Sequence, residues 1–377
     1  MISDRQSSLV FLSSIFCVLL FFGCKYQKET TSVEDPSKGV LFEKTLPTTV
    51  IDSFIEHKRI KYKIPAVSLA VLKEGKIAYF KNYGVVNAVT QEPITQEAVF
   101  EAASITKPVF AYTVCRLSQK GFIDLEETLH ERFPFPDDMI EKYPCYTNMT
   151  VRHVLTHTSG LPNWGVDLIS CPGEKYGYSG QGFEFLTKAL AKSFTEVMDV
   201  RIMNYLNEEV LLPFEMDNTY FVESATLKEL CVDGHLDGKP AEQEFPESPE
   251  MAFGMHSNAK DIAKFAINLL NNSKLNARLE NEFFSIQTQV PSEEKEFDST
   301  YDQGYGLGLY LRQSPHGMVF GHSGSNYDFK CLFEVYEDLK MGYVIMTNSD
   351  SGDLLTDEMA YFLIEGIEKK AKARVDD

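Results

Sequence analysis

A serine and a lysine three residues apart, Ser104 and Lys107, are the first candidates for chemistry in this chain. On a helix, side chains three residues apart share one face, so the amine can lie beside the hydroxyl. Burial disfavours the charged ammonium and lowers the pKa of a lysine, which makes a neutral amine available as a base. A base beside a hydroxyl is the minimum that a serine nucleophile requires. The pair therefore predicts Ser104 as a nucleophile with Lys107 as the base beside it.

The spacing alone is a weak signal, because Ser-x-x-Lys occurs at three places in the chain. One of the other two serines lies in an acidic run that is typical of a solvated loop. The other precedes an amphipathic segment and is expected to help cap its helix. These further pairs are Ser292/Lys295 and Ser257/Lys260, and neither context favours a buried base.

The residues that follow Ser104 separate it from the other two serines. Residues 109–117 are apolar nearly all round, as in a buried helix. Pro108 is tolerated only in the first turn of a helix, so this helix is predicted to begin at about Ser104. On these residues alone, a serine that merely caps the helix, with Lys107 facing solvent, remains the alternative interpretation.

The elements that must position this pair are strands near both ends of the chain and helices between them. Helices are predicted from about Thr48, over residues 258–270 and over residues 354–373, and Glu74-Gly75 predicts a hairpin turn. Strands are predicted over residues 67–71, 77–83, 318–321, 329–336 and 342–347. We therefore predict an α+β fold with one catalytic domain over residues 46–374. Its sheet is closed by both terminal segments, and a helical subdomain over approximately residues 104–250 is inserted in it.

Composition narrows the function classes further. The chain has 377 residues, of which 44% are hydrophobic, enough for a large core. Its net charge of −19 repels phosphate backbones, so we expect no nucleic acid among its partners. The sequence contains no G-x-S-x-G, H-E-x-x-H, P-loop or complete G-x-G-x-x-G, and it therefore predicts neither a metal nor a cofactor.

The N-terminus predicts export. Residues 9–22 form an apolar run that is short for a membrane span and typical of a signal peptide. The run ends in Gly23-Cys24, which resembles the bacterial lipoprotein signal and implies cleavage before Cys24 and a lipid on its thiol. We expect a signal peptide over residues 1–23, a flexible tether over residues 24–45, and a membrane-anchored lipoprotein facing the periplasm or the cell surface. An uncleaved anchor helix is the alternative.

The cysteines permit a disulfide without assigning it. Apart from Cys24 and one cysteine in the apolar run, five remain, with wide spacings and no C-x-x-C pair. These spacings do not predict a zinc or redox motif. Cys115 lies in the apolar helical run, where core packing is expected.

Several ordered segments resemble the serine β-lactamase and penicillin-binding-protein superfamily, especially its class C, DD-peptidase and esterase branch. The nucleophile motif is represented by FEAASIT and the following Lys107, the second motif by PGEKYGYSGQG, and the third by GHSGS. TVRHVLTHTSGLP, LPFEMDNTY and GYGLG also fall in the expected order. The resemblance implies an α+β fold with an antiparallel sheet that is flanked by the terminal helices.

The resemblance also implies roles for individual residues. Ser104 would be acylated, Lys107 would activate it, and Tyr178 would be the general base, with its phenol deprotonated or sharing a proton with Lys107. The amide groups of Ser104 and Ser325 would form the oxyanion hole. His322 would face the anionic or carbonyl end of the substrate, with Ser323 and Gly324 beside it on the same strand edge. A buried structural phenol at Tyr178 and a structural His322 are the alternatives, and His153 and His157 are expected to be architectural.

Two departures from the family pattern bear on the substrate. The second motif reads Tyr178-Ser179-Gly180 instead of Tyr-x-Asn, so the amide that contacts the substrate's acyl-amide group is missing. The third motif has His322 instead of lysine, and an unperturbed histidine is half-neutral near pH 6.5. We therefore expect a serine hydrolase that cleaves an ester, an amide or a D-amino-acid peptide bond in a small-molecule or peptide substrate. A β-lactamase proper and a penicillin-binding or sensor module without turnover are the alternatives. Loops over residues 163–173 and 233–249 are expected to line the cleft.

Overall fold

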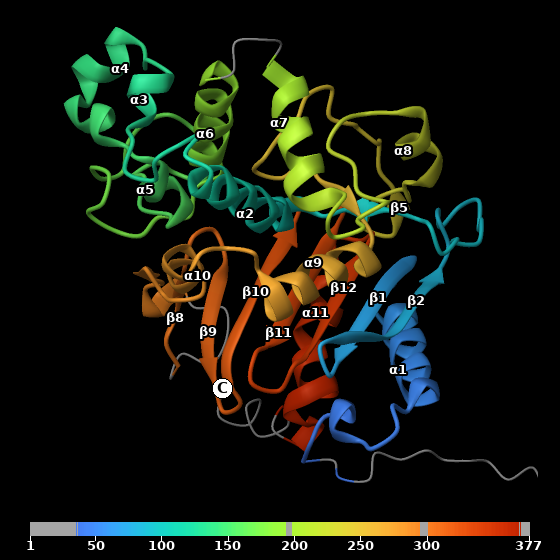
Figure 1. Cartoon of the computed structure of the whole chain (residues 1–377). Helices are drawn as coiled ribbons and strands as arrows, with labels where there is room; N and C mark the ends of the chain where they lie inside the picture. Colours follow the sequence, from blue (N-terminus) through green and yellow to red (C-terminus); the bar gives the residue numbers. More distant parts are fainter. Residues whose placement is uncertain (1–34, 36, 194–197, 295–300, 369, 371–377) are drawn as a thin grey trace, which may run out of the picture. The chain divides into compact units, whose positions relative to one another are not determined.

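An eight-stranded antiparallel sheet carries the fold (Figure 1), in the order β2-β1-β12-β11-β10-β9-β8-β7. The computed structural model describes residues 35, 37–193, 198–294, 301–368 and 370. The strands are β1 Ala66–Lys73, β2 Lys76–Gly84, β7 Thr288–Gln289, β8 Gln303–Tyr305, β9 Tyr310–Ser314, β10 Gly317–Ser325, β11 Lys330–Tyr336 and β12 Met341–Thr347. The expected α+β fold with an antiparallel sheet is confirmed.

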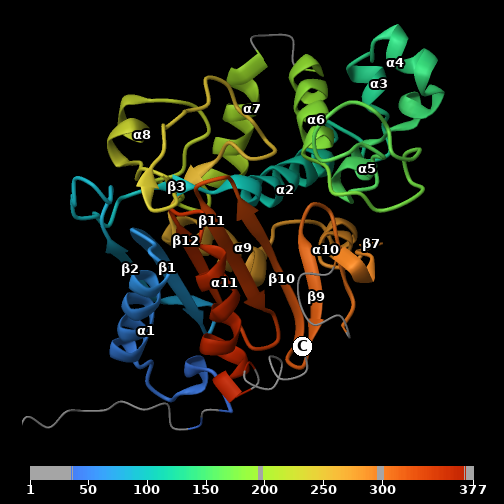
Figure 2. The ribbon, with the colours of Figure 1, turned by 180° about the vertical axis from the view of Figure 1, so that it is seen from behind.

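Helices cover both faces of this sheet. Helix α1 (Thr48–Lys61) and helix α11 (Asp353–Ala360) pack on one face, and α9 (Ala259–Asn272) packs on the other (Figures 1 and 2). Strand β1 shows why, because alternate side chains point to opposite faces. Val67, Leu69 and Val71 join the core beneath α1 and α11, whereas Ala66, Ala70 and Leu72 join the core beneath α9.

The remaining helices gather mostly at one end of the sheet (Figure 1). They are α2 Thr106–Gln119, α3 Leu129–Arg132, α4 Asp137–Lys142, α5 Val151–Leu155, α6 Gly180–Ser193, α7 Met198–Leu206, α8 Ala225–Leu230 and α10 Ala277–Phe283. Two small ribbons accompany them, β3 Phe100–Glu101 with β6 His256–Ser257 and β4 His235–Leu236 with β5 Lys239–Pro240. In the sequence, the helices α2 to α8 thus lie between strand β2 and strands β7 to β12. This is the part of the chain in which we expected an inserted helical subdomain.

The predicted hairpin between β1 and β2 turns at Glu74 and Gly75, which have φ angles of 55° and 68°. Two successive positive φ angles match the twist of an antiparallel pair. The predicted final helix is interrupted. Helix α11 continues as a π-helical turn to Glu365, Gly366 with a φ of 90° breaks it, and residues 367–368 and 370 are again helical. Residues 369 and 371–373 of the prediction lie outside the described residues.

The N-terminal predictions fall mostly outside the described residues. These are the signal peptide over residues 1–23, the lipid site Cys24 and the tether up to residue 34. The tether does not extend to residue 45 as expected. Val40 and Leu41 form a 3₁₀ turn and are fully buried, and the amide of Gly39 donates to the carbonyl of Ile364 at 3.1 Å. Across the described part of the chain, no helix has the length and apolar character needed to cross a membrane.

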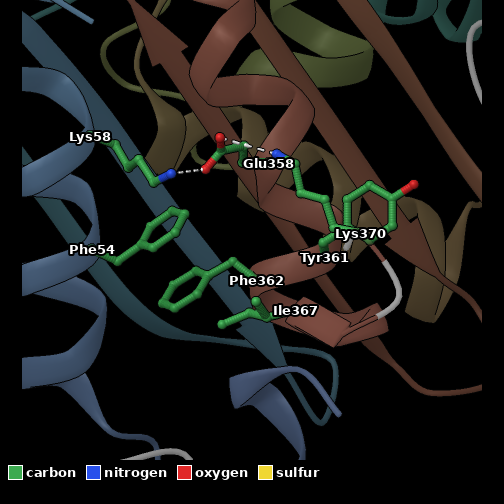
Figure 3. A pocket seen from close by; sticks show the side chains of 7 residues that line it. All are labelled: Phe54, Lys58, Glu358, Tyr361, Phe362, Ile367 and Lys370. Carbon is green, nitrogen blue, oxygen red and sulfur yellow. Dashed lines mark ion pairs between the residues drawn. The ribbon is translucent and has the colours of Figure 1, made fainter. Parts of the chain in front are cut away.

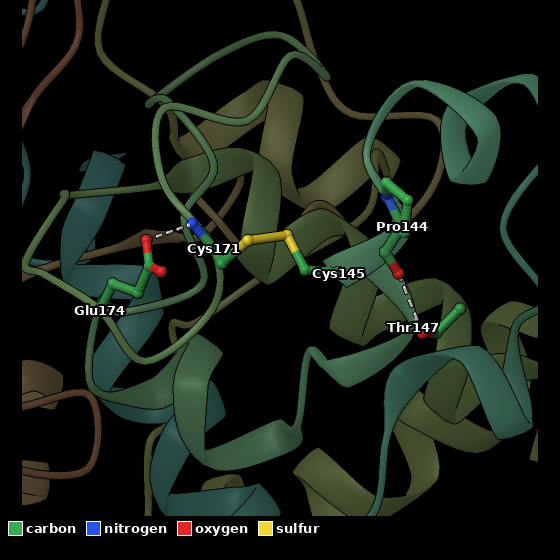
Figure 4. Close-up of a disulfide and its surroundings, with 5 residues drawn as sticks. All are labelled: Pro144, Cys145, Thr147, Cys171 and Glu174. Atoms are coloured by element: carbon green, nitrogen blue, oxygen red, sulfur yellow. Dashed lines mark hydrogen bonds between the residues drawn. A yellow bond between two sulfur atoms is a disulfide. The ribbon is translucent and has the colours of Figure 1, made fainter.

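A disulfide that the sequence left unassigned joins Cys145 to Cys171 (Figure 4). It ties the 3₁₀ turn Pro144–Asn148 to the loop that precedes α6, across a sequence separation of 26 residues. The described cysteines outside it are Cys115, Cys231 and Cys331, which are free and buried. Cys115 therefore packs in the core, as expected.

Buried carboxylates hold charged networks together on both the sheet and the helices that cover it, and two of these networks lie in the described residues near the terminal segments. On the sheet, the guanidinium of Arg312 in β9 donates to Glu334 in β11 at 2.8 Å, and the Tyr343 hydroxyl donates to the same carboxylate at 2.6 Å. On the opposite side from α9, Glu358 pairs with Lys58 and, at 3.1 Å, with Lys370 (Figure 3). That second network borders a cavity of about 350 Å³, lined by Phe54, Lys58, Glu358, Tyr361, Phe362, Ile367 and Lys370. None of the candidate catalytic residues lines this cavity.

Candidate active site

Ser104 lies where the ribbon strand β3 turns into helix α2. The amide of Ala102 donates to the carbonyl of Met255 at 2.8 Å, which fastens the chain just before the serine. Ala103 then adopts a φ of 47°, a strained value for a residue with a Cβ. A 3₁₀ turn over Ala103–Ile105 runs directly into α2, so the helical segment begins within one residue of the predicted start. Ser104 stays partly exposed while the helix behind it is buried.

Lys107 lies beside the serine and away from solvent. Its Nζ is 3.1 Å from Ser104 Oγ, and it donates to the carbonyl of Ala252 at 2.7 Å. The side chain is 1% exposed, so the alternative of a solvent-facing lysine is wrong. Burial lowers the pKa of Lys107 to about 7, an effect that the charge of Glu184 partly opposes. Close to half of the lysine is therefore a neutral amine at pH 7.

Tyr178 is the second residue that approaches Lys107. The lysine Nζ lies 4.8 Å from the centre of the phenol ring. His157 also contacts this ring, and its imidazole stacks on it with a centroid distance of 4.4 Å and an interplanar angle of 27°. The second sequence motif is thus in contact with the nucleophile motif.

His157 holds this motif in place as a neutral ring. Its Nδ1 accepts a hydrogen bond from the amide of Ser179 at 3.1 Å, and its carbonyl accepts one from the amide of Gly177 at 2.8 Å. Burial, followed by the positive charge of Lys107, lowers the pKa of His157 well below its ordinary value. An architectural role was expected for this histidine. Its contacts with Tyr178 and Ser179 show that it supports the second sequence motif.

The third motif lies at the end of β10. His322 is 2% exposed, and its Nδ1 lies 2.5 Å from the carbonyl oxygen of Ser323, so Nδ1 carries the proton and Nε2 is an acceptor. Burial and the nearby charge of Lys107 lower the pKa of His322 to about 3. The imidazole is therefore fully neutral at pH 6.5, and the expectation of a half-protonated residue there is corrected.

Gly324 brings β10 against the nucleophile segment. A Cβ at this position would overlap the carbonyl oxygen of Ala102 and come within 2.6 Å of the Cys331 sulfur. Cys331 itself lies beneath both segments, with its Sγ 3.2 Å from the Ala102 carbonyl. Only glycine allows this approach, which brings the strand that ends at the exposed Ser325 up to the residues before Ser104.

Two groups near Lys107 were not identified from the sequence. Glu184 on α6 accepts a hydrogen bond from the amide of Ala252 at 3.2 Å, and burial raises its pKa. The carbonyl of Ala252 is the acceptor of Lys107 described above. Neither group belongs to a recognisable local motif, because they meet Lys107 only through tertiary packing.

The other two Ser-x-x-Lys sequences do not form such a site. Ser257 does not cap α9 as expected: the cap is Asn258, whose side chain accepts from the amide of Asp261 at 2.9 Å. Ser257 lies in β6, with its hydroxyl 2.8 Å from that of Thr219. Ser292 is exposed in a short 3₁₀ turn, in accord with a solvated loop, and Lys295 lies outside the described residues. Within the described ranges, no group of three or more His, Cys, Asp or Glu side chains is arranged to hold a metal ion.

Comparisons with known proteins identify the family of this chain. The beta-lactamase family model matches residues 51–366. A beta-lactamase of Yersinia enterocolitica is 24% identical over 58% of this chain and 58% of its own. Penicillin-binding protein 4* of Bacillus subtilis is 22% identical over 73% of this chain and 66% of its own, and protein flp of Staphylococcus aureus is 22% identical over 80% and 63%. The chain thus spans about three fifths to two thirds of the length of these curated relatives.

Solved structures show the same fold. The octameric penicillin-binding protein homologue from Pyrococcus abyssi superposes with a TM-score of 0.70 at 24% identity, covering 81% of this chain and 74% of that one. A class C beta-lactamase superposes with a TM-score of 0.67 at 18% identity, covering 82% and 94%. The family supports a serine-hydrolase or penicillin-binding type of function in general terms. The family model matches most of the chain, and the solved structures share its fold. The chain therefore belongs to the beta-lactamase family and has the serine β-lactamase and transpeptidase-like architecture.

Proposed function

We propose that this protein is a serine hydrolase that works through an acyl-enzyme on Ser104 and cleaves an ester, an amide or a D-amino-acid peptide bond. One observation carries the proposal. The Lys107 amine lies 3.1 Å from Ser104 Oγ in a buried position, and its pKa is lowered to about 7. A general base works best when its pKa is near the operating pH, and this amine meets that condition.

In this proposal, the neutral Lys107 takes the proton of Ser104 as Oγ attacks the substrate carbonyl carbon. The phenol of Tyr178, whose ring lies 4.8 Å from the amine, passes a proton to the departing group, which leaves with the electron pair of the broken bond. Water then attacks the acyl carbon of the ester on Ser104 and gives a proton to the Tyr178 phenolate. The Lys107 ammonium returns a proton to Ser104 Oγ as the bond between Oγ and the acyl carbon breaks, and the acid product departs. The cation at Lys107 favours ionisation of the phenol, since a nearby positive charge stabilises phenolate.

The negative oxygen of the tetrahedral intermediate needs preorganised donors. We assign this role to the backbone amides of Ser104 and Ser325, and the close approach of β10 at Gly324 supports the assignment. His322 is neutral, and its Nε2 is buried without a hydrogen-bond partner among the described residues. We therefore propose that the partly exposed Ser323 contacts a polar group of the substrate and not a carboxylate, and that His322 joins this contact only when substrate binding exposes Nε2.

Covalent labelling with a fluorophosphonate tests the proposed function. The probe is expected to label the wild type at Ser104 and to leave Ser104→Ala unlabelled, whereas Ser257→Ala, which changes the second Ser-x-x-Lys sequence, is expected to label normally. Turnover of nitrocefin, short-chain p-nitrophenyl esters and D-Ala-D-Ala peptides then identifies the kind of bond that the enzyme cleaves. A folded wild type that does not label refutes the proposal, and labelling with no turnover of any substrate favours a penicillin-binding or sensor module.

We further propose that the protein is exported and anchored to the membrane through a lipid on Cys24. The Cys145–Cys171 disulfide supports export, because disulfides persist mainly in oxidising compartments. Metabolic labelling with a radioactive fatty acid tests the anchor. The wild type is expected to carry the label and Cys24→Ser to lose it, and a labelled Cys24→Ser would refute this site.

A further inference from the structure

The position two residues after Tyr178 has no side chain, and its space is already occupied. Gly180 is buried and does not have a positive φ, so its backbone conformation would accept any residue. A Cβ built there would lie 2.9 and 3.0 Å from two ring carbons of Trp164, and 3.1 Å from the Asn163 side-chain oxygen. Space and not conformation therefore favours glycine at this position while the indole keeps its place, and the indole is the main group that fills the space.

The contacts of Trp164 place the indole at the edge of the candidate active site. Its ring meets that of Phe253 edge-on, with centroids 5.4 Å apart and an interplanar angle of 90°. Phe253 directly follows Ala252, whose carbonyl accepts from Lys107 at 2.7 Å. The indole thus touches both segments that flank the buried lysine, one through Gly180 and one through Phe253.

The loop that carries this indole is fastened near both of its ends. The side-chain oxygen of Asn163 accepts from the amide of Gly180 at 2.9 Å, and its carbonyl accepts from the amide of Gln181 at 2.9 Å. Farther along the loop, the disulfide binds Cys171 to Cys145. Even so, Trp164 is 53% exposed, so a large part of the ring is available for contact. An apolar ring that is held in place and left open is suited to binding an apolar group at little cost in entropy.

We infer that Trp164 is a specificity-determining residue that selects substrates with an apolar or aromatic acyl group. This inference rests on the acyl-enzyme function proposed above and extends it to the substrate class. In this proposal, an acyl chain that binds beside Tyr178 contacts the indole of Trp164. The indole fills the space that a polar side chain at position 180 would need. An aromatic or aliphatic acyl group packs on that ring, whereas an amide in the same place loses its hydrogen bonds to water without gaining a partner.

Ester kinetics test this selection. The ratio of kcat/KM for p-nitrophenyl phenylacetate to that for p-nitrophenyl acetate is expected to fall roughly tenfold in Trp164→Ala. Trp164→Phe is expected to restore most of the ratio, and Phe122→Ala, which removes another exposed aromatic ring, to keep the wild-type ratio. An unchanged ratio in Trp164→Ala overturns the inference. A wild type that turns over no ester and is not labelled at Ser104 refutes the proposed function instead, so the two failures are distinguishable.

A second arm tests the steric argument at Gly180. Gly180→Asn alone is expected to lower esterase activity strongly, because the new side chain collides with the indole. The double variant Trp164→Ala/Gly180→Asn is expected to remove this collision and to recover activity. Because it restores the amide of the Tyr-x-Asn motif, its kcat/KM for nitrocefin is expected to rise relative to that for the esters. Full esterase activity in Gly180→Asn alone overturns the inference. Trp164 is the only tryptophan in the chain, so quenching of its fluorescence by the phenylacetate ester in a Ser104→Ala background gives an independent binding measurement.

Discussion

Replacing Lys107 by methionine is expected to slow acylation of Ser104 strongly and, at the same time, to stabilise the fold below pH 7. Lowering the pKa of this lysine from 10.5 to about 7 raises the neutral fraction at pH 7 from about one in three thousand to about one half. Loss of a general base of this kind slows the chemical step by about 10² to 10⁴-fold.

The stability change follows from the same pKa. Each pH unit between 10.5 and about 7 corresponds to about 1.4 kcal/mol, so the protonated and buried lysine costs the fold about 5 kcal/mol. Because the folded pKa lies below the unfolded one, this cost is complete below pH 7 and fades as the pH rises toward 10.5. Methionine avoids the cost but leaves the Ala252 carbonyl without its donor, which costs about 1 to 3 kcal/mol. A net gain of about 2 to 4 kcal/mol is therefore expected at pH 6, and it should shrink steadily above pH 7.

Two measurements check this reasoning. The rate of fluorophosphonate labelling of the wild type is expected to rise tenfold per pH unit up to about pH 7 and then to level off. No second inflection is expected near pH 6.5, because the pKa of His322 is about 3. Urea unfolding at pH 6 and pH 9 measures the stability. Lys260→Met, at the exposed lysine of the second Ser-x-x-Lys sequence, is the control and should leave the labelling profile unchanged. Wild-type labelling of Lys107→Met, or an inflection that remains above pH 9, would refute a neutral lysine base.

Substitutions at three further places in the fold test its framework. Gly324→Ala is expected to slow labelling about 100-fold, because its Cβ would push β10 away from Ala102, and an unchanged labelling rate would contradict this. Cys145→Ser/Cys171→Ser is expected to lose about 3.5 kcal/mol of unfolding free energy in urea, from the closure entropy of a loop spanning 26 residues, and an unshifted urea midpoint would argue against it. Arg312→Met is expected to lose about 3 to 5 kcal/mol, because it leaves the buried carboxylate of Glu334 without its cationic partner. Arg312→Met/Glu334→Met should recover most of that loss in the same assay, and a double variant no more stable than the single one would show that the pair is not the cause.

Elements that depend on local chemistry were predictable from the sequence. The hairpin at Glu74 and Gly75 follows from a turn glycine that accepts positive φ between two strand-like runs, and α9 follows from its amphipathic period. Ser104 and Lys107 belong to the same class, because a spacing of three residues brings their side chains together on any helix. The departures were local too. Gly366 interrupts the last helix, at a position where the apolar pattern gave no sign of a break.

Contacts made by tertiary packing were not predictable from the sequence. His157 stacks on Tyr178, and Glu184 and Lys107 both form hydrogen bonds with the backbone of Ala252. The residues in each of these contacts are far apart in the sequence, so no local pattern connects them. Trp164 fills the space at Gly180 in the same way, from a loop whose sequence names no partner. The disulfide was beyond reach for a simpler reason, because five cysteines with wide spacings allow many pairings.

The position of β1 in the sheet has a consequence for how the chain folds. Val67 in β1 pairs with Thr347 in β12, so the first and last long strands are neighbours. During synthesis, β1 has only β2 to pair with until residue 347 has emerged, and two strands alone are marginally stable in water. Contacts across such a separation also form slowly, because a long loop must close first. We therefore expect nascent chains that end before β12 to remain unfolded, and the nucleophile to be assembled only after nearly the whole chain has been made.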